Sequence, residues 1–363
     1  MSGGSAPFTG VRRVGVAALG DYPDRIDVRS PAEFAVDHLP GAVNHPVLDD
    51  GERARVGTLY AASAFDARKL GAAIVARNIA SMVESAFIDR PREWRPLVYC
   101  WRGGQRSRAL GLVLHEIGWR AVQLEGGYRA YRRHVVAELT QAPRRFRYAV
   151  ICGLTGSGKS RLIAALAGAG AQTLDLEGIA RHRGSLLGGL PGEVQPSQKH
   201  FESALLDALS RLDASRPVFV ESESRRIGAV QMPDALLEAM RLGRTLTLWT
   251  PREQRVALLK EEYGHFLTAP GALGLCLGPL VELHGKAKIA RWEAMAAGAD
   301  WDALIAELLD VHYDPIYARS LARNFAERTS HAIEAKSVTP AAFDALAREL
   351  RAAIEDDASL ETR

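Results

Sequence analysis

Two glycine-rich loops, about fifty residues apart, each follow a short apolar run. Residues 100–107 read Cys-Trp-Arg-Gly-Gly-Gln-Arg-Ser after Pro-Leu-Val-Tyr, and residues 153–160 read Gly-Leu-Thr-Gly-Ser-Gly-Lys-Ser after Tyr-Ala-Val-Ile-Cys. A loop that leaves a strand and enters a helix presents backbone N–H groups and the positive end of the helix to an anion. The chain is therefore predicted to be an α/β protein with two anion-binding loops, which fits an enzyme and not a structural protein.

The length of 363 residues predicts about two domains. In the first half, strand-like runs at residues 25–28, 98–99 and 122–124 alternate with helical patterns, including a helix that begins at Ser30-Pro31 and an apolar stripe over 70–87. This alternation predicts a parallel sheet. We place the first α/β domain at residues 11–138, a linker at 139–147, a second α/β domain at 148–250 and a helical region at 251–363.

The second domain is predicted to have four strands, at residues 148–152, 173–176, 218–221 and 245–249. After about residue 252 the pattern is helical to the end, with a last helix that starts at Thr339-Pro340. The apolar stretch 269–283 contains two prolines and three glycines. It is too short and broken to span a bilayer, and it is predicted to be a loop or a buried connector.

The composition bears on the location and the partners of the protein but not on the reaction that it catalyses. Hydrophobic residues make up 47% and charged residues 25%, which is ordinary for a soluble globular protein. The net charge of +3 permits an RNA partner without requiring one. Three cysteines make no disulfide framework, and the N-terminus lacks the apolar core of a signal peptide. We expect a cytoplasmic protein with no membrane segment.

In the first loop, Cys100 is the candidate nucleophile, because a thiolate at a helix N-terminus is favoured by the helix dipole and the loop N–H groups. Gly103 and Gly104 let the backbone curl, while Arg102 and Arg106 supply charge for an anion. Ser107 is predicted to cap the following helix. Cys-dependent phosphatases use the same Cys-to-Arg spacing, so the loop alone leaves sulfur and phosphatase chemistry open. A buried structural role fits Cys152 and Cys276 better than it fits Cys100.

The second loop has the Walker A pattern, in which backbone N–H groups surround a phosphate, a lysine reaches the terminal phosphates and a hydroxyl holds Mg²⁺. Ser160 is the predicted metal ligand, and Glu221 or Glu223, at the end of the strand 218–221, the second acidic group. Arg225 could clamp phosphate, contact RNA or be solvated. The predicted binding residues of the loop are Gly153, Thr155, Gly156, Ser157, Gly158, Lys159 and Ser160.

Three further motifs resemble those of rhodanese domains, in the order found there. They are Asp-Val-Arg-Ser-Pro-Ala-Glu-Phe at 27–34, His-Leu-Pro-Gly-Ala-Val-Asn-His-Pro at 38–46 and Glu-Gly-Gly-Tyr-Arg-Ala-Tyr at 125–131. The resemblance covers residues 11–137 and implies that Cys100 carries a persulfide or perselenide. The Cys-to-Arg interval is one residue longer than in many sulfurtransferases, which suits a larger anion such as selenophosphate.

The order of a rhodanese domain and a Walker A domain resembles that of the bacterial tRNA 2-selenouridine synthase family. The motifs at residues 176–185, 195–198, 221–228 and 313–317 extend the resemblance over nearly the whole chain. It implies a tRNA partner and two co-substrates. The sulfur of wobble 2-thiouridine is first alkylated by geranyl diphosphate, and selenium from selenophosphate then displaces the geranylated sulfur. We infer that the Walker A loop holds the diphosphate rather than hydrolysing ATP.

A tRNA partner requires positive surface, and three basic clusters are candidates. They are Arg144, Arg145 and Arg147; His182 and Arg183; and Lys286, Lys288 and Arg291, with Trp292 as a stacking platform for a base. The main alternative is a P-loop NTPase or kinase with an appended rhodanese sulfur carrier that acts on a small molecule. A third possibility is a rhodanese part that only mediates interactions, and the glycine-rich loop at Cys100 argues against it.

Overall fold

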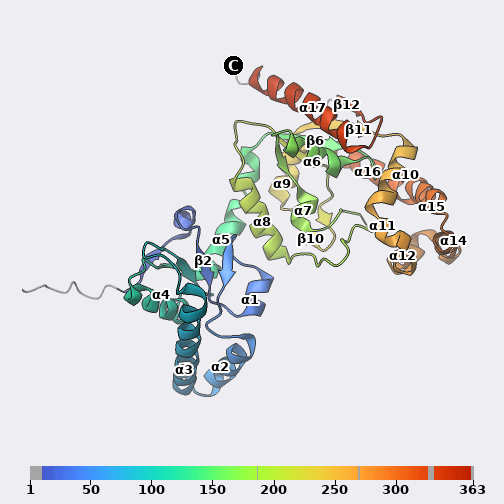
Figure 1. The fold of residues 1–363 in the computed structure, drawn as a ribbon. Helices are drawn as coiled ribbons and strands as arrows, with labels where there is room; N and C mark the ends of the chain where they lie inside the picture. The colour runs from blue at the N-terminus through green and yellow to red at the C-terminus, as the bar shows by residue number, and fades with distance from the viewer. Residues whose placement is uncertain (1–9, 186, 269, 326–330, 361–363) are drawn as a thin grey trace, which may run out of the picture. The chain divides into compact units, whose positions relative to one another are not determined.

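A computed structural model describes residues 10–185, 187–268, 270–325 and 331–360 (Figure 1). The chain divides into two compact units. Unit 1 comprises Met1–Glu138 with Lys199–Asp207, and unit 2 comprises Leu139–Gln198 with Ala208–Arg363. Each unit contains a parallel sheet, so the predicted α/β class is confirmed.

The sheet of unit 1 has five parallel strands in the order β1-β5-β4-β2-β3. The strands are β1 (Arg12–Val14), β2 (Arg25–Asp27), β3 (Ala42–Asn44), β4 (Leu97–Tyr99) and β5 (Val122–Leu124). The helices are α1 (Pro31–Val36), α2 (Asp50–Ala62), α3 (Ala64–Met82), α4 (Gln105–Ile117) and α5 (Gly127–Glu138), with a 3₁₀-helix η1 (Val16–Asp21) and a π-helical turn η2 (Val83–Phe87). Most of α8 (Gln198–Ser210) also packs in this unit.

Local sequence explains where these elements begin. Ser30 and Glu33 form a capping box, and Pro31 occupies the first turn of α1, where its missing N–H has no cost. The predicted apolar stripe over 70–87 is confirmed as α3 and η2, which bury Ile74, Ile79, Met82 and Phe87. The interior strands β4 and β5 are fully buried, as expected for the middle of a parallel sheet.

A buried ion pair joins several of these elements. Arg29 and Asp27 are 1% and 0% exposed, and the Arg29 Nη2 lies 2.6 Å from the Asp27 Oδ2. The guanidinium also donates to the carbonyl of Asp37, after α1, at 2.7 Å and lies 4.0 Å from the ring centroid of Tyr128 in α5. The pair therefore connects β2, the end of α1 and α5.

Unit 2 has a second five-stranded parallel sheet, in the order β12-β11-β6-β8-β7. Its strands are β6 (Tyr148–Cys152), β7 (Gln172–Leu174), β8 (Val218–Glu221), β11 (Arg244–Trp249) and β12 (His331–Glu334), with a small hairpin of β9 (Arg226–Ile227) and β10 (Val230–Gln231). The helices before residue 250 are α6 (Lys159–Gly168), α7 (Leu176–Ala180) and α9 (Asp234–Leu242), and a 3₁₀-helix, η3 (Ala142–Arg145), precedes β6. The long α17 (Pro340–Leu360) packs beside α6 (Figure 1).

Two predictions for unit 2 are wrong at the level of single elements. The strand predicted at 173–176 ends at Leu174, because Asp175 caps α7 by accepting a hydrogen bond from the N–H of Gly178. The region after residue 252 is not helical throughout, because β12 pairs with β11 at the edge of the sheet. Only Ile333 of β12 is buried, so the segment carries little of the alternation by which a strand is predicted.

The remaining helices form an α-helical part of unit 2. They are α10 (Arg252–Glu262), α11 (Gly264–Thr268), α12 (Pro270–Leu277), η4 (Gly278–Leu280), α13 (Val281–His284), α14 (Lys286–Ala297), α15 (Trp301–Leu308), η5 (Leu309–Tyr313) and α16 (Asp314–Phe325). The described residues of the 269–283 stretch are thus helical, so the prediction of a loop is wrong. The alternative prediction of a buried connector agrees with the burial of Leu273, Leu277 and Leu280. Pro270 begins α12 and Pro279 lies in the first turn of η4, positions that tolerate proline. No helix in the described part of the chain is long and apolar enough to cross a membrane.

We expect Arg29→Met to destabilise unit 1 by about 3–5 kcal/mol, because the Asp27 carboxylate would stay buried without its charged partner. The measurement is hydrogen exchange of the β2 and β4 amides in the full chain. Arg225→Met is the control: its partner is Asp234, and their side chains are 61% and 65% exposed. The control should change stability by less than about 1 kcal/mol. Equal effects of the two substitutions would contradict the structural role of the buried pair.

Candidate functional sites

Cys100 lies directly after β4 and is 3% exposed. Its Sγ accepts hydrogen bonds from the backbone N–H of Gly104, at 3.3 Å, and from the hydroxyl of Ser107, at 3.2 Å. Both donors lie at the start of α4, whose first N–H groups have no partner within the helix. The loop is therefore built to stabilise negative charge on the sulfur.

Ser107 does not have the predicted role. The N-cap of α4 is Gly104, and Ser107 is buried within the first turn. The amide of Gln123, in β5, donates to the Ser107 Oγ at 2.7 Å and to the carbonyls of Gly103 and Gly104 at 3.0 and 3.1 Å. Because Gln123 supplies a hydrogen to the Ser107 oxygen, the serine hydroxyl is free to donate to the sulfur.

The closing motif at residues 125–131 lies against the cysteine loop. The N–H of Tyr128 donates to the carbonyl of Cys100 at 2.9 Å. Gly127 has a φ of +58°, and a Cβ at this position would lie 2.2 Å from the same carbonyl oxygen. Only glycine allows this approach, so the motif sets the shape of the loop.

Arg106 does not contact the sulfur in this structure. Its Nη1 lies 2.8 Å from the Glu33 Oε2, at the start of α1. Desolvation would raise the pKa of Glu33, but the hydrogen bond and charge of Arg106 outweigh it and the pKa is lowered. An anion at this loop would therefore compete with Glu33 for Arg106. The predicted roles of Arg106 and of the exposed Arg102 stay predictions.

The Walker A loop connects β6 to α6 as predicted. Lys159 is 8% exposed, and its Nζ donates to the carbonyls of Gly153 and Leu154 at 3.0 and 3.3 Å. The ring centroid of Tyr317 lies 4.8 Å from the same nitrogen. Gly158 has a φ of +90°, and a Cβ there would lie 2.3 Å from the Phe343 ring. The loop and its lysine are thus held by the unit's own core.

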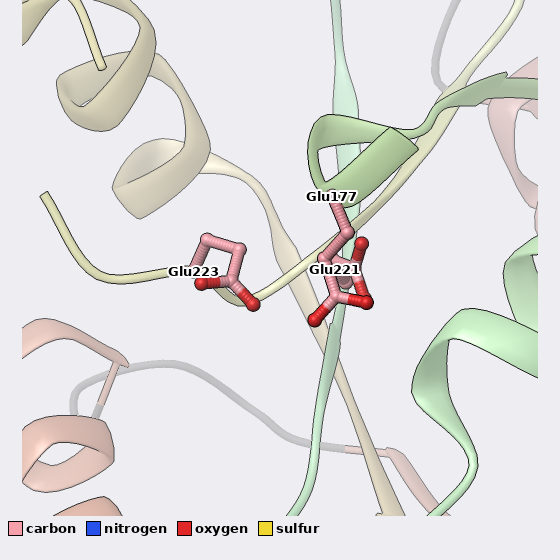
Figure 2. A group of neighbouring side chains, drawn as sticks. All are labelled: Glu177, Glu221 and Glu223. Atoms are coloured by element: carbon pink, nitrogen blue, oxygen red, sulfur yellow. The ribbon is translucent and has the colours of Figure 1, made fainter. Parts of the chain in front are cut away.

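A cluster of three glutamates lies beside this loop (Figure 2). Glu177 follows β7, Glu221 ends β8 and Glu223 follows β8, and one carboxylate oxygen from each lies within 4.8 Å of the others. The Ser160 hydroxyl contacts the Glu177 Oε2 at 2.7 Å and the Glu221 Oε2 at 3.0 Å. Sequence reasoning named Glu221 and Glu223 as alternatives but missed Glu177.

Burial dominates the electrostatics of this cluster. Desolvation raises the pKa of Glu221 well above its ordinary value, with repulsion from Glu177 and Glu223 adding to it. Desolvation and the charge of Glu177 raise the pKa of Glu223 to about 8. Desolvation also raises the pKa of Glu177, against the hydrogen bond from Ser160. The Oε1 atoms of Glu221 and Glu223 are buried without a hydrogen-bond partner.

These oxygens form a donor set that suits a hard cation. Mg²⁺ prefers carboxylate and other oxygen ligands, and buried carboxylates that lack partners are costly unless a positive charge offsets them. Ser160, Glu177, Glu221 and Glu223 are the residues that could hold the ion. The predicted ligand Ser160 and the predicted acidic group Glu221 are brought together, since they contact each other.

The other predicted residues are dispersed. Arg225 is exposed and paired with Asp234, so its predicted contact with phosphate stays a prediction. Burial raises the pKa of the Cys152 thiol to about 11, in keeping with a structural role. The prediction that Trp292 is a stacking platform for a base is wrong. Trp292 is 0% exposed, because its indole packs among α12, α14 and α15 in the core of the helical part.

We expect the metal-free protein to lose stability as the pH rises from 4.5 to about 8. In this window folded Glu223 keeps a proton that the unfolded chain has lost, so the folded state binds more protons and the free energy of unfolding decreases. The Glu223→Gln variant should lack this decrease in stability. The decrease amounts to several kcal/mol, because each pKa unit of the shift corresponds to about 1.4 kcal/mol. The measurement is calorimetric unfolding of both proteins at pH 5 and pH 8.

Added Mg²⁺ should stabilise the unmodified protein more at pH 8 than at pH 5, because binding requires ionised carboxylates. If the stability of Glu223→Gln decreases between pH 5 and pH 8 as much as that of the unmodified protein, the prediction that folded Glu223 keeps a proton is contradicted. A Mg²⁺ effect that does not depend on pH would contradict binding at the three glutamates.

The comparisons with known proteins agree with the two-unit architecture. The rhodanese-like domain family matches residues 17–134, and the family described as tRNA 2-selenouridine synthase AAA domain matches residues 146–270. A solved N-terminal domain of a putative ATP/GTP binding protein from Clostridium difficile is 30% identical, with a TM-score of 0.31, and covers 34% of this chain and 98% of that one.

Two relatives match over more residues than either unit contains, so each match includes parts of both units. The tRNA 2-selenouridine synthase of Nitrosomonas europaea is 37% identical over 269 residues, which cover 73% of this chain and 69% of the relative. The protein of the same name from Hydrogenovibrio crunogenus is 37% identical over 249 residues, 66% of this chain and 67% of the relative. With a rhodanese loop in one unit and a Walker A loop in the other, the chain belongs to the tRNA 2-selenouridine synthase family.

Proposed function

We propose that this protein converts wobble 2-thiouridine in tRNA to 2-selenouridine through a geranylated intermediate. Geranyl diphosphate and selenophosphate are the co-substrates, and the setting is the cytoplasm. Relatives named for this activity support the overall reaction. The observation that carries the proposal is the Cys100 sulfur, which accepts hydrogen bonds from Gly104 and Ser107 at the start of a helix.

In the first step, we assign the diphosphate of geranyl diphosphate to the Walker A loop. The thiouridine sulfur attacks the first carbon of the geranyl group, the carbon–oxygen bond breaks, and its electron pair goes to diphosphate. The base loses its N3 proton to water. The leaving diphosphate gains negative charge, which the N-terminus of α6 and the Lys159 ammonium would stabilise. Lys159 would exchange its contacts with the Gly153 and Leu154 carbonyls for contacts with the ligand.

We assign Mg²⁺ to Ser160, Glu177, Glu221 and Glu223. When bound, the ion would neutralise part of the charge of the diphosphate. The chain's own contribution is to hold three carboxylates close together beside the serine hydroxyl.

In the second step, selenium replaces the geranylated sulfur. The bond between C2 of the base and sulfur breaks, geranyl thiolate leaves with the electron pair, and a bond between C2 and selenium forms. Cys100 carries this selenium as a perselenide. Water releases selenide and phosphate from selenophosphate, and the selenide displaces a small thiol from a mixed disulfide on Cys100. After the selenium has bonded to C2, the small thiol attacks the Cys100 sulfur, the sulfur–selenium bond breaks with its electron pair on selenium, and the mixed disulfide forms again. The Gly104 N–H and the Ser107 hydroxyl would stabilise the anionic form of the perselenide, and Arg106 would attract selenophosphate once it leaves Glu33.

The acidic cluster also favours a second candidate, a P-loop NTPase or kinase with an appended rhodanese sulfur carrier. Carboxylates at the end of the strand next to the Walker A strand are the usual means of holding the Mg²⁺ of a nucleoside triphosphate. Strict dependence of the reaction on ATP would favour this candidate.

Cys100→Ser should abolish formation of 2-selenouridine, because a hydroxyl cannot carry selenium. Geranylation should persist, so geranylated 2-thiouridine should accumulate. Mass spectrometry of tRNA nucleosides from cells that carry the variant measures both products. Cys276→Ser, which changes a cysteine outside either loop, is the control and should make normal amounts. Normal 2-selenouridine with Cys100→Ser would rule out the assigned nucleophile.

Lys159→Ala should lower geranyl transfer by about ten- to a hundredfold, because a hydrogen bond to a charged group contributes roughly 1.5–3 kcal/mol. Selenium exchange into tRNA that is already geranylated should be unchanged. Paired assays in vitro, one from 2-thiouridine tRNA and one from geranylated tRNA, measure the difference. Lys336→Ala, at an exposed lysine, is the control. Equal loss in both assays would contradict a role limited to the diphosphate.

A further inference from the structure

An apolar groove opens beside the Walker A loop, entirely within unit 2. Its walls come mainly from α10, α11, α12, α15 and η5, and they include Leu259, Phe266, Leu273, Ile305 and Leu308. The empty volume of the groove, with its open mouth, is about 570 Å³.

The groove is continuous with the phosphate loop. Thr155 belongs to both, and its Oγ1 is buried without a hydrogen-bond partner. Leu259 packs against the loop so closely that a Cβ at Gly156 would lie 2.8 Å from its side chain. A ligand held by its phosphates in the loop would therefore have its other end beside the groove.

A buried arginine fixes this arrangement. Arg255 is 5% exposed, and its Nε donates to the Thr155 carbonyl at 2.9 Å. Its Nη1 and Nη2 bind both carboxylate oxygens of Asp314, at 2.9 and 2.5 Å. The pair holds α10 and α16 to the phosphate loop, so the groove keeps its place relative to the loop.

Few polar groups of the groove are available to a ligand. The Ser185 hydroxyl and the Tyr263 hydroxyl bond to each other at 3.2 Å, and Lys260 pairs with Asp302 at 2.8 Å. A nucleoside would bury ring nitrogens and ribose hydroxyls against leucine and isoleucine, which costs free energy unless each finds a partner. A hydrocarbon chain needs no such partners.

We infer that the groove binds the hydrocarbon tail of a prenyl diphosphate whose diphosphate lies in the Walker A loop. This inference rests on the proposed function and adds to it the site that selects the tail. The groove would also make the loop prefer a prenyl diphosphate to a nucleotide. Each CH₂ group that enters such a groove raises affinity by about fourfold.

The test is calorimetric binding of three ligands to the full-length protein: inorganic pyrophosphate, dimethylallyl diphosphate and geranyl diphosphate. Geranyl diphosphate should bind at least about a hundredfold more tightly than pyrophosphate, even after the cost of ordering its chain. Dimethylallyl diphosphate, with half the carbon atoms, should fall between them.

The Ile305→Phe substitution fills the groove from α15. We expect it to lower the affinity for geranyl diphosphate by about tenfold or more and to leave the affinity for pyrophosphate unchanged. The Leu273→Phe substitution fills the groove from α12 and should have the same effect. Agreement between the two variants would show that the effect does not come from a local defect in one of them. Ala303→Phe is the matched control, because Ala303 lies exposed on α15 outside the groove. Unchanged pyrophosphate binding shows that each variant is folded.

Failure of the groove and failure of the proposed function give different results. If pyrophosphate binds but geranyl diphosphate binds no more tightly, the groove assignment is overturned and the diphosphate site stands. If both Phe variants bind geranyl diphosphate as tightly as the unmodified protein does, the groove assignment is overturned as well. If the unmodified protein binds neither ligand, the diphosphate site itself is overturned, and the tail site with it.

Discussion

A helix that follows a parallel strand through a short loop has first N–H groups without backbone partners, and both candidate sites lie at such a junction. In unit 1 the junction is between β4 and α4, and its Gly104 N–H donates to the Cys100 sulfur. In unit 2 it is between β6 and α6, at Lys159. The same backbone geometry is the physical basis of both proposals, an anionic sulfur in one unit and a phosphate in the other.

The two units balance charge around these junctions in different ways. In unit 1, Arg106 is already paired with Glu33, so a bound anion replaces an existing partner. In unit 2, three carboxylates are crowded in the interior, and two of their oxygens have no hydrogen-bond partner. That arrangement is unfavourable without a proton or a cation. Unit 2 is therefore the part whose stability should respond to pH and Mg²⁺.

Sequence patterns predicted the buried strands more accurately than the strands at the edges of the sheets. The strands β5, β6 and β8 begin and end as predicted, because each is a continuous buried apolar run or a run bounded by clear breaks. The edge strand β12 was not predicted, and α12 and η4 lie where a loop or a buried connector was predicted. An edge strand with one buried residue has little pattern, and the prolines of α12 and η4 resemble loop signals until their places in the first turns are known.

The sequence by itself determined the α/β class, the places of both glycine-rich loops and the family, since each depends on residues close together in the chain. Only the tertiary structure decided which distant residues complete the sites. Gln123 joins the cysteine loop because β5 lies beside β4, and Glu177 joins Glu221 because β7 lies beside β8. Trp292 was judged a surface residue from its neighbours in sequence, yet it is buried, because burial depends on helix packing across the unit. The groove beside Thr155 has the same origin: its walls come from helices that are separate in the chain and meet only in the folded protein.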